Sequence, residues 1–574
     1  GEFTLENKPG KGLSLRAVGG ANILDGQKKE WRRAYGKYGV DGLISTAFGQ
    51  KSPNSVTQNN SHRQYLTGQL IAEYKGVFGK HDINVLGGWS AEENLYEDLQ
   101  GKRTNIVGNE LPALNLGDAD GWSNAADENE WALLSGFMRA SYAFAAKYLV
   151  EVNFRADASS RFSKKNRWGV FPSASVGWRI TEEKFMQNQH IFDNLKLRAS
   201  WGQWGIQNGL GLYDHIASYN INGYYPFKSE LGQWAVISKL PSESRTWETV
   251  EVKNIAVDMA FLRNRLTVTG EYFIKKNKDM LVSIEIPSII GIDVPTGNYG
   301  ELKVKGWEVT VGWQDKIKDF SYGARFNLSD QKDKLVDYGV EYNGFVAGVN
   351  QKVQGYSLGS IFGYRTDGYF TSEEEVKNSA AFNKAITGVG DIKYIDKDGD
   401  GKISAPNDLE YLGTTTPRYT FGLNLTAAWK GFDLGVLLQG VGKRNFYLSS
   451  EVMNPYYATW NNFSYKMHND YWTPENPNAA FPRYYAGANH NYQISDHWLQ
   501  NAAYVRLKNL QLGYTISPKL TKSWGIQRLR VYFSGDNLCE YSKLNDNFDP
   551  ELSNINGYVY PIMRNFSFGI NVTL

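Results

Sequence analysis

The chain has 574 residues, a formal net charge of +2 at pH 7, one cysteine and 14% aromatic residues. The nearly neutral charge gives no electrostatic basis for nucleic-acid binding, and a single cysteine excludes a disulfide framework and a thiolate zinc site. No apolar run approaches the roughly 20 residues of a membrane-spanning helix, but a membrane β-strand needs apolar residues only at alternate positions.

Several segments alternate apolar and polar residues over about the ten residues that a tilted membrane strand requires. In chain order they are 148–157, 173–180, 194–201 and 565–574. In the third of these, Leu195, Leu197, Ala199 and Trp201 share one face, and Lys196, Arg198 and Ser200 share the other. A β-sandwich would show the same alternation, so the pattern alone leaves both folds open.

The lengths of the connections between these segments distinguish a membrane barrel from a β-sandwich. Short connections are expected at 78–81, 145–147, 263–265, 315–319 and 429–432, and long ones at 95–130, 203–246, 332–417 and 445–501. The connection after Thr181 is longer than the other short ones, and we expect it to contain a helical turn. Short and long connections largely alternate, which is typical of a membrane barrel and not of a sandwich or propeller. The sequence therefore predicts an all-β, transmembrane antiparallel β-barrel with about 16 strands, long extracellular loops and short periplasmic turns.

Inside the longest loop, 332–417, three aspartates at every second position resemble an EF-hand-type calcium loop. Asp396, Asp398 and Asp400 occupy ligand positions 1, 3 and 5, Gly401 takes the turn position 6, and Lys402 would offer its main-chain carbonyl at position 7. Oxygen ligands of this kind suit a hard cation such as Ca²⁺. No flanking helices are expected, so this would be an isolated loop at 396–408 with a structural role.

The closing ligand of this loop is less obvious. Position 12 is Asn407, and we expect one extra residue near Ala405 to bring Asp408 in as the closing carboxylate, with Glu410 a weaker candidate. The alternative interpretation is a polar turn without an ion, because an Asp-Gly-Asp-Gly run is also strong turn chemistry.

Other candidate sites are weaker. His490 and His497 are close in sequence, but two histidines without a third ligand rarely make a zinc site. Aromatic residues gather at 213–227 and 453–465, where they could form an interfacial girdle, contact a partner protein or stack on sugars. No catalytic motif is present, no catalytic or substrate-binding residue can be named, and we expect no enzyme activity.

Six segments resemble, in amino-acid sequence and in order along the chain, segments of one protein family. They are RADASSRFSKKNRWGVFPSASVGWRITEEKFM (155–186), RNRLTVTGEYFIKKNKDML (263–281), NYGELKVKGWEVTVGW (298–313), GDIKYIDKDGDGKI (390–403), PRYTFGLNLTAAWKGFDLGVLLQGVG (417–442) and YPIMRNFSFGINVTL (560–574). With these segments the chain resembles the C-terminal part of the SusC-like (SusC/RagA) TonB-dependent outer-membrane transporters, which carry the aspartate motif at the same place.

This resemblance implies a 22-stranded barrel with an N-terminal plug, of which residues 1–574 would be the C-terminal portion. The plug and about six strands would be missing, and the chain would pair with that N-terminal part because unpaired strand edges are costly in hydrocarbon. The implied partners are a SusD-like lipoprotein lid, the TonB complex through the absent part, outer-membrane lipid, and a second transporter–lid pair. The implied function is import of oligosaccharides or peptides. Leu574 departs from the terminal Phe usual in this family.

A secreted, soluble all-β carbohydrate-binding protein with a calcium-stabilised loop is the alternative function. Phe566, Phe568, Ile570 and Val572 share one face of the last segment. That face suits lipid and would be an aggregation hazard on a soluble surface, so we favour the outer membrane.

Overall fold

The computed structural model describes residues 1–574 except 36–37, 39–41, 43–52, 109, 228–229, 238, 284–288, 290–294, 340–344, 450–451, 457–464, 553–559 and 561. The chain divides into two compact units. Unit 1 comprises Gly1–Val176, Gly202–Thr249 and Ser283–Asn298, and unit 2 comprises Gly177–Trp201, Val250–Val282 and Tyr299–Leu574. Among the described residues, no helix is long and apolar enough to cross a membrane.

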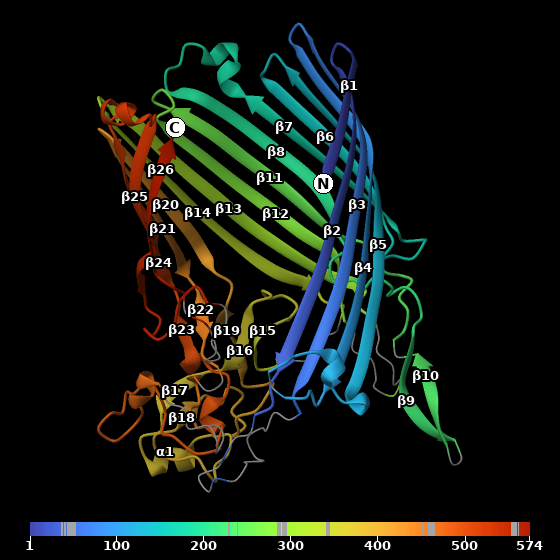
Figure 1. Ribbon diagram of the computed structural model, residues 1–574. Coiled ribbons are helices and arrows are strands. Elements are labelled where there is room, and N and C mark those ends of the chain that lie inside the picture. Colours follow the sequence, from blue (N-terminus) through green and yellow to red (C-terminus); the bar gives the residue numbers. More distant parts are fainter. Residues whose placement is uncertain are drawn as a thin grey trace. The chain divides into compact units, whose positions relative to one another are not determined.

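Unit 1 contains six consecutive antiparallel strands, which run side by side in Figure 1. They are β1 (Glu2–Gly10), β2 (Leu13–Arg32), β3 (Ser55–Phe78), β4 (His81–Thr104), β5 (Trp122–Phe144) and β6 (Tyr148–Ser159). The β3–β4 hairpin keeps one register from Ser55 opposite Thr104 to Phe78 opposite His81. Its two-residue turn contains Gly79 at φ 63°, the left-handed conformation that tight hairpin turns require.

The chain continues through four more long strands and one isolated hairpin. The long strands are β7 (Trp168–Arg179), β8 (Phe192–Ile206), β11 (Glu248–Phe261) and β12 (Leu266–Val282). Between β7 and β8 lie two short 3-10 turns, η3 (Ile180–Glu182) and η4 (Lys184–Met186), which confirms the helical turn expected after Thr181. The hairpin β9 (Tyr219–Phe227) and β10 (Glu230–Ile237) belongs to unit 1.

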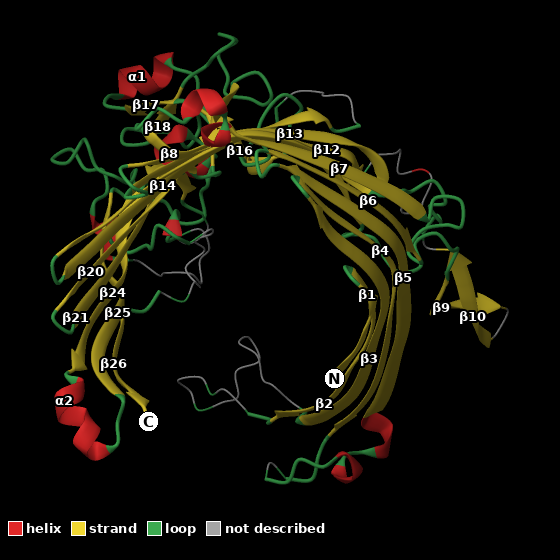
Figure 2. Ribbon diagram, turned by 90° about the horizontal axis from the view of Figure 1, so that it is seen from above, coloured by secondary structure: helices red, strands yellow, loops and turns green. Residues whose placement is uncertain are grey.

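Unit 2 holds the second series of consecutive antiparallel strands. They are β13 (Gly297–Ile317), whose first two residues belong to unit 1, β14 (Phe320–Asp337), β20 (Arg418–Trp429), β21 (Phe432–Lys443), β24 (Tyr504–Ile516), β25 (Arg528–Ser542) and β26 (Asn565–Thr573). A short helix, α2 (Pro518–Thr521), and the 3-10 turn η10 (Lys522–Trp524) join β24 to β25 (Figure 2). The described residues contain 17 barrel-type strands, against about 16 predicted, and the antiparallel all-β fold is confirmed.

The two faces of the strands differ as predicted. In β6, Val150, Val152 and Phe154 are exposed. On the other face, Glu151 accepts a hydrogen bond from Ser141 at 2.8 Å, and Arg155 donates to Asp157 at 2.8 Å. In β26 the apolar face is Phe566, Phe568, Ile570 and Val572, of which Phe568 is 83% exposed. An outward apolar face of this kind fits hydrocarbon, and the inward polar face fits a wet lumen.

The long connections of unit 2 fold into a small packed region, here called the loop domain: the described residues between β14 and β20 and between β21 and β24. Its strands and helix are β15 (Gly348–Gln351), β16 (Ser360–Tyr364), β17 (Thr366–Tyr369), α1 (Glu373–Asn378), β18 (Ile392–Tyr394), β19 (Leu409–Thr414), β22 (Asn445–Tyr447) and β23 (Leu499–Asn501). Its 3-10 turns are η7 (Lys466–Asn469), η8 (His490–Tyr492) and η9 (Asp496–Trp498). One apolar core joins both long connections and also takes in Leu544, which follows β25.

One predicted boundary is wrong. The connection expected at 95–130 is shorter, because β4 continues to Thr104 and β5 already begins at Trp122, with the 3-10 turns η1 (Leu114–Leu116) and η2 (Ala119–Gly121) between them. The additional strand residues carry polar side chains on both faces, such as Glu97 opposite Glu128 and Asp98 opposite Asp127. A strand that extends beyond the lipid has water on both sides, so the apolar alternation disappears while the hydrogen-bonded ladder continues.

Candidate functional site

The aspartate-rich loop connects β18 to β19 and is held at three points by the core of the loop domain. Tyr394 precedes it, Leu409 follows it, and Ile403 lies within it, and all three side chains are buried. Gly399 and Gly401 have φ values of 76° and 82°, a left-handed conformation that glycine adopts without steric cost. The apolar anchors and the two glycines together shape the loop around its carboxylates.

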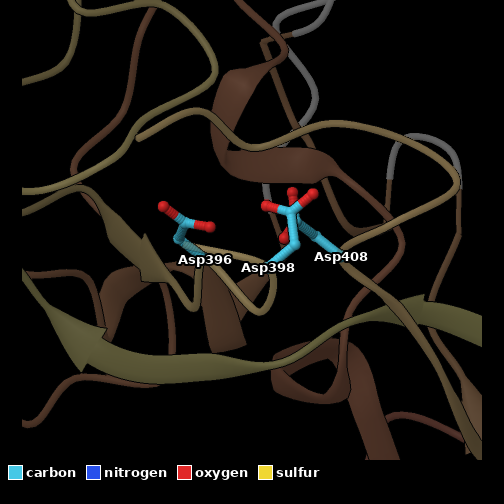
Figure 3. A group of neighbouring side chains, drawn as sticks. All are labelled: Asp396, Asp398 and Asp408. Atoms are coloured by element: carbon cyan, nitrogen blue, oxygen red, sulfur yellow. The ribbon is translucent and has the colours of Figure 1, made fainter. Parts of the chain in front are cut away.

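Three carboxylates meet in this loop (Figure 3). Asp396, Asp398 and Asp408 each have an oxygen within 4.8 Å of the others. Asp408 is buried, Asp396 is half-buried and Asp398 is exposed. Among the described residues, this is the one group of at least three His, Cys, Asp or Glu side chains whose ligand atoms lie close enough to share a metal ion.

Main-chain N–H groups orient the Asp396 carboxylate. Gly399 donates to its Oδ1 at 2.7 Å, and Gly401 donates to its Oδ2 at 2.8 Å. Desolvation raises the pKa of Asp396, but the N–H donors of Gly401 and Gly399 outweigh it and hold the pKa below its usual range. Asp396 is therefore a charged, fixed carboxylate at neutral pH.

Asp408 fastens the two ends of the loop to each other. Its Oδ1 accepts from the N–H of Lys397 at 2.8 Å, and its Oδ2 accepts from the N–H of Ser404 at 2.7 Å. The side-chain amide of Asn407 donates to Asp398 at 2.7 Å. Because an ionised carboxylate has about four acceptor positions, each of these oxygens can accept a hydrogen bond and still contact a cation.

The structure groups three of the five predicted ligands. Asp400, expected at position 5, lies outside the group, and its Oδ1 accepts from the N–H of Lys402 at 2.8 Å. The predicted ligand from Lys402 is its main-chain carbonyl oxygen, which takes no part in this hydrogen bond. Of the three closing candidates, Asp408 joins the group, Asn407 is a donor to it, and Glu410 instead lies 3.2 Å from the guanidinium of Arg365.

The two histidines considered for zinc have separate partners. His490 Nε2 lies 3.0 Å from the buried carboxylate of Asp391, and His497 Nε2 lies 3.1 Å from the carbonyl of Ala480. Asn491 also donates to Asp391, at 2.9 Å. Sequence reasoning missed this buried Asp391 cluster, because its members lie about 100 residues apart and share no motif.

Polar side chains also line a hollow on the inner face of unit 2. This cavity of about 1010 Å³ lies along β12, β13, β14, β20, β21 and β24 near their short turns. Its charged lining residues include Arg265, Asp315, Arg325 and Asp433, and Arg265 pairs with Asp315 at 2.9 Å. A wall of paired charges can contact water or a polar protein surface, as a barrel lumen requires.

The aromatic segments are described only in part. In 213–227, Tyr213 accepts a hydrogen bond from the N–H of Glu130 at 3.0 Å, and Tyr219, Tyr224 and Tyr225 are exposed. Residues 457–464 of the second segment, 453–465, lie outside the described residues. Neither segment identifies a substrate ligand.

Comparison with known proteins agrees with this architecture. A family model described as "TonB dependent receptor-like, beta-barrel" matches residues 5–538. The chain is 30% identical to TonB-dependent receptor P26 of Formosa agariphila, over 87% of this chain and 52% of that protein. It is 28% identical to TonB-dependent receptor SusC of Bacteroides thetaiotaomicron, over 90% of this chain and 50% of that protein. The chain thus spans about half the length of the curated relatives it matches.

A solved structure has the same fold. The chain matches a structure of the RagAB peptide transporter with a TM-score of 0.83 and 22% identity, over the whole of this chain and 61% of that chain.

Proposed function

Because the chain belongs to the TonB-dependent receptor-like β-barrel family, we propose that it forms the greater part of the barrel of an importer. Members of this family are outer-membrane β-barrels. The curated SusC relative bears out the SusC/RagA resemblance seen in the sequence, and the RagAB structure has the same fold. The outer-membrane location argues against the alternative of a secreted, soluble carbohydrate-binding protein. The cargo would be oligomeric nutrients, either oligosaccharides or peptides, and the protein would bind and pass them without covalent chemistry.

The observation that carries this proposal is the division of the strands into an apolar outer face and a charged inner face. Arg198, for example, pairs with Asp258 and Glu271, both at 3.0 Å. Such ion pairs are stable beside water and would be costly beside lipid. The polar hollow near the short turns suits a hydrophilic plug, on which TonB-driven opening of the channel would act.

The loop domain supports the proposal of a SusD-like lid. Its packed core, which includes Trp498 at 1% exposure and Val452 at 0%, gives the extracellular side a shaped surface in place of separate loops. A surface that is already ordered costs less to bind than separate loops that must first become ordered. We propose that the lid binds this domain, and that transporter–lid pairs assemble as dimers.

The three carboxylates of Asp396, Asp398 and Asp408 would bind Ca²⁺ within this domain. Each is negatively charged and has an oxygen within 4.8 Å of the others, and Asp408 is buried. Hard oxygen ligands of this number suit Ca²⁺, with carbonyls and waters completing its shell. The ion would stabilise the β18–β19 connection and take no part in transport chemistry.

Cargo capture by the purified outer-membrane complex tests the proposed function. The complex would be titrated with defined mixtures of oligosaccharides and of peptides, and bound molecules would be identified by mass spectrometry. Retention of one class at micromolar concentration supports an importer and names its cargo. Retention of neither class by a folded complex that still carries its lid would contradict it.

A further inference from the structure

A groove on the outer face of unit 1 lies beside a basic loop. The groove has a volume of about 700 Å³, and its lining includes Gly68, Glu93, Leu134 and Trp168, with Arg167 at its rim. The loop 160–167 joins β6 to β7 and contains four basic residues, Arg161, Lys164, Lys165 and Arg167. We propose that this groove and loop bind a phosphate-bearing acyl lipid of the outer leaflet.

The height of the loop matches the lipid headgroups. β6 has 12 residues, which at about 3.4 Å per residue extend about 40 Å. Tilted by about 45°, such a strand rises about 28 Å, close to the apolar band of about 25 Å in membrane barrels. β5, its neighbour, has 23 residues, so the β6–β7 loop forms a step at the outer interface beside the longer strand.

Three cations of the loop are available for an anion. Lys164 and Lys165 are exposed, and Arg167 is half-buried at the rim of the groove. Within the described part of the chain, none of the three forms an ion pair. Arg161 is different, because it donates to the carbonyl of Leu210 at 2.9 Å. Two carboxylates line the groove, Glu92 and Glu93. Glu92 accepts a hydrogen bond from Tyr65 at 2.7 Å, which leaves Glu93 against Arg167 of the lining and the two exposed lysines of the loop.

Hydrogen bonds fix the loop in place. Ser163 and Asn166 both donate to the carbonyl of Glu243 at 2.8 Å, and Trp247 donates to the carbonyl of Arg167 at 3.0 Å. Phe162 is 1% exposed and packs against Trp247, with ring centroids 5.0 Å apart. Because the main chain is held, only the lysine side chains, and not the loop, have to become ordered when a ligand binds.

The groove below the loop suits acyl chains. Leu134 and Trp168 are 48% and 56% exposed on the apolar outer face, and a Cβ added at Gly68 would meet nothing within 4 Å. A phosphate above an apolar slot is the chemistry of a phospholipid or phosphorylated glycolipid. Free phosphate would use the cations but gain nothing from the slot.

Lipid titration of the full protein, purified from outer membranes in an uncharged detergent, tests this site. Native mass spectrometry would count dipalmitoyl phosphatidic acid or dipalmitoyl phosphatidylcholine bound to the wild type, to K164Q/K165Q and to G68W. Each lysine near an anionic surface contributes about fivefold in affinity, so the double variant is expected to bind phosphatidic acid about 30-fold more weakly. G68W fills the slot and is expected to weaken both lipids.

The matched control is K519Q/K522Q, which removes two exposed lysines from the α2–η10 connection and is expected to leave phosphatidic acid binding unchanged. Unchanged binding in K164Q/K165Q would overturn the proposal. A second result would also overturn it: inorganic phosphate displaces phosphatidic acid, and G68W binds lipid normally. The loop would then be a site for phosphate alone. Pairing of two protein copies through this face, in place of lipid binding, would also overturn the proposal.

Discussion

The buried carboxylate of Asp408 accepts a hydrogen bond from the main-chain N–H of Lys397 at 2.8 Å, across 11 residues of the chain. With its other oxygen it accepts from the N–H of Ser404. Asp408 therefore closes the loop by itself, and a cation would add to a shape that already exists. Asp396 and Asp398, which are more exposed, depend more on a cation to offset their mutual repulsion.

Removing one exposed carboxylate should separate ion binding from loop shape. Asp398→Ala is expected to lower calcium affinity at least about tenfold, because affinity follows the number of charged ligands. Asp400→Ala should have a smaller effect, since Asp400 lies outside the group. Isothermal titration calorimetry of the detergent-purified protein measures both, and Asp367→Ala, which changes a carboxylate paired with Lys393, is the control. An equal loss of calcium affinity in all three variants would show that Asp398 is not a ligand.

Removing Asp408 should open the loop with or without calcium. Asp408→Ala leaves the N–H groups of Lys397 and Ser404 without their acceptor, at about 1–3 kcal/mol for each group that stays buried. Hydrogen exchange of the peptide covering 395–409 should accelerate in this variant in calcium-free buffer, while Asp398→Ala stays protected. Protection equal to that of the wild type would contradict the closing role of Asp408.

His468 should make the loop domain sensitive to mild acid. Burial lowers the pKa of His468, and its Nδ1 accepts from the N–H of Tyr465 at 2.9 Å while Nε2 donates to the carbonyl of Val452 at 2.8 Å. A proton on Nδ1 would face an N–H group. The unfolded state, with a pKa of about 6.5, binds this proton first. Stability is therefore complete above about pH 6.5 and falls as the pH drops below it.

The measurement is hydrogen exchange of the segment 465–484 between pH 7.5 and 5, corrected for the intrinsic rate at each pH. His468→Gln lacks this titrating ring, so its protection should be lower and should change less with pH than that of the wild type. Some pH dependence remains, because burial also lowers the pKa of His497, whose Nε2 lies 3.1 Å from the carbonyl of Ala480 in the same segment. A wild-type protein whose corrected protection is the same at pH 7.5 and 5 would exclude this role for His468.

The two faces of β26 should respond differently to the same charge. Phe568→Arg places a cation near the middle of the lipid band and is expected to cost about 2–4 kcal/mol. Ser567→Arg, on the neighbouring lumen-facing position, should cost little. Urea unfolding and the heat-dependent gel shift of the folded barrel compare the two. A greater loss of stability in Ser567→Arg than in Phe568→Arg would reverse the assignment of the lipid-facing and lumen-facing sides.

Arg506 should hold the segment after β25 against the barrel wall. Its side chain is 2% exposed and pairs with Glu540, with Asp549 at 2.7 Å and with Glu551 at 3.0 Å. Arg506→Met leaves Glu540 and Asp549 without this cation, while Glu551 keeps Lys508 at 2.8 Å. Removing one partner of a buried ion pair costs about 3–5 kcal/mol. Limited proteolysis within 543–552 should increase strongly. Arg528→Met, at an exposed position on β25, is the control and should cleave like the wild type.

The membrane-facing part of the fold was predictable because alternation at positions such as Val150, Val152 and Phe154 is imposed by lipid on one side and water on the other. The extent of β4 and β5 was not, because Glu97 and Glu128 lie where both faces are wet. The aspartate motif located the candidate site and pointed to Asp408 as its closing carboxylate, but its spacing could not show that Asp400 would lie outside the group. The core of the loop domain escaped detection because Ile403, Trp498 and Leu544 come from three separate connections.

Energy-dependent uptake tests the central proposal most directly. Cells that carry the whole transporter with its lid would receive the labelled oligosaccharide or peptide that the purified complex retains, before and after collapse of the proton-motive force. The proposal predicts that label accumulates inside energised cells, that collapse of the force stops it, and that removal of the barrel chain abolishes it. Equal accumulation with and without the barrel chain, or accumulation unaffected by the collapse, would contradict the role of this protein in TonB-driven import.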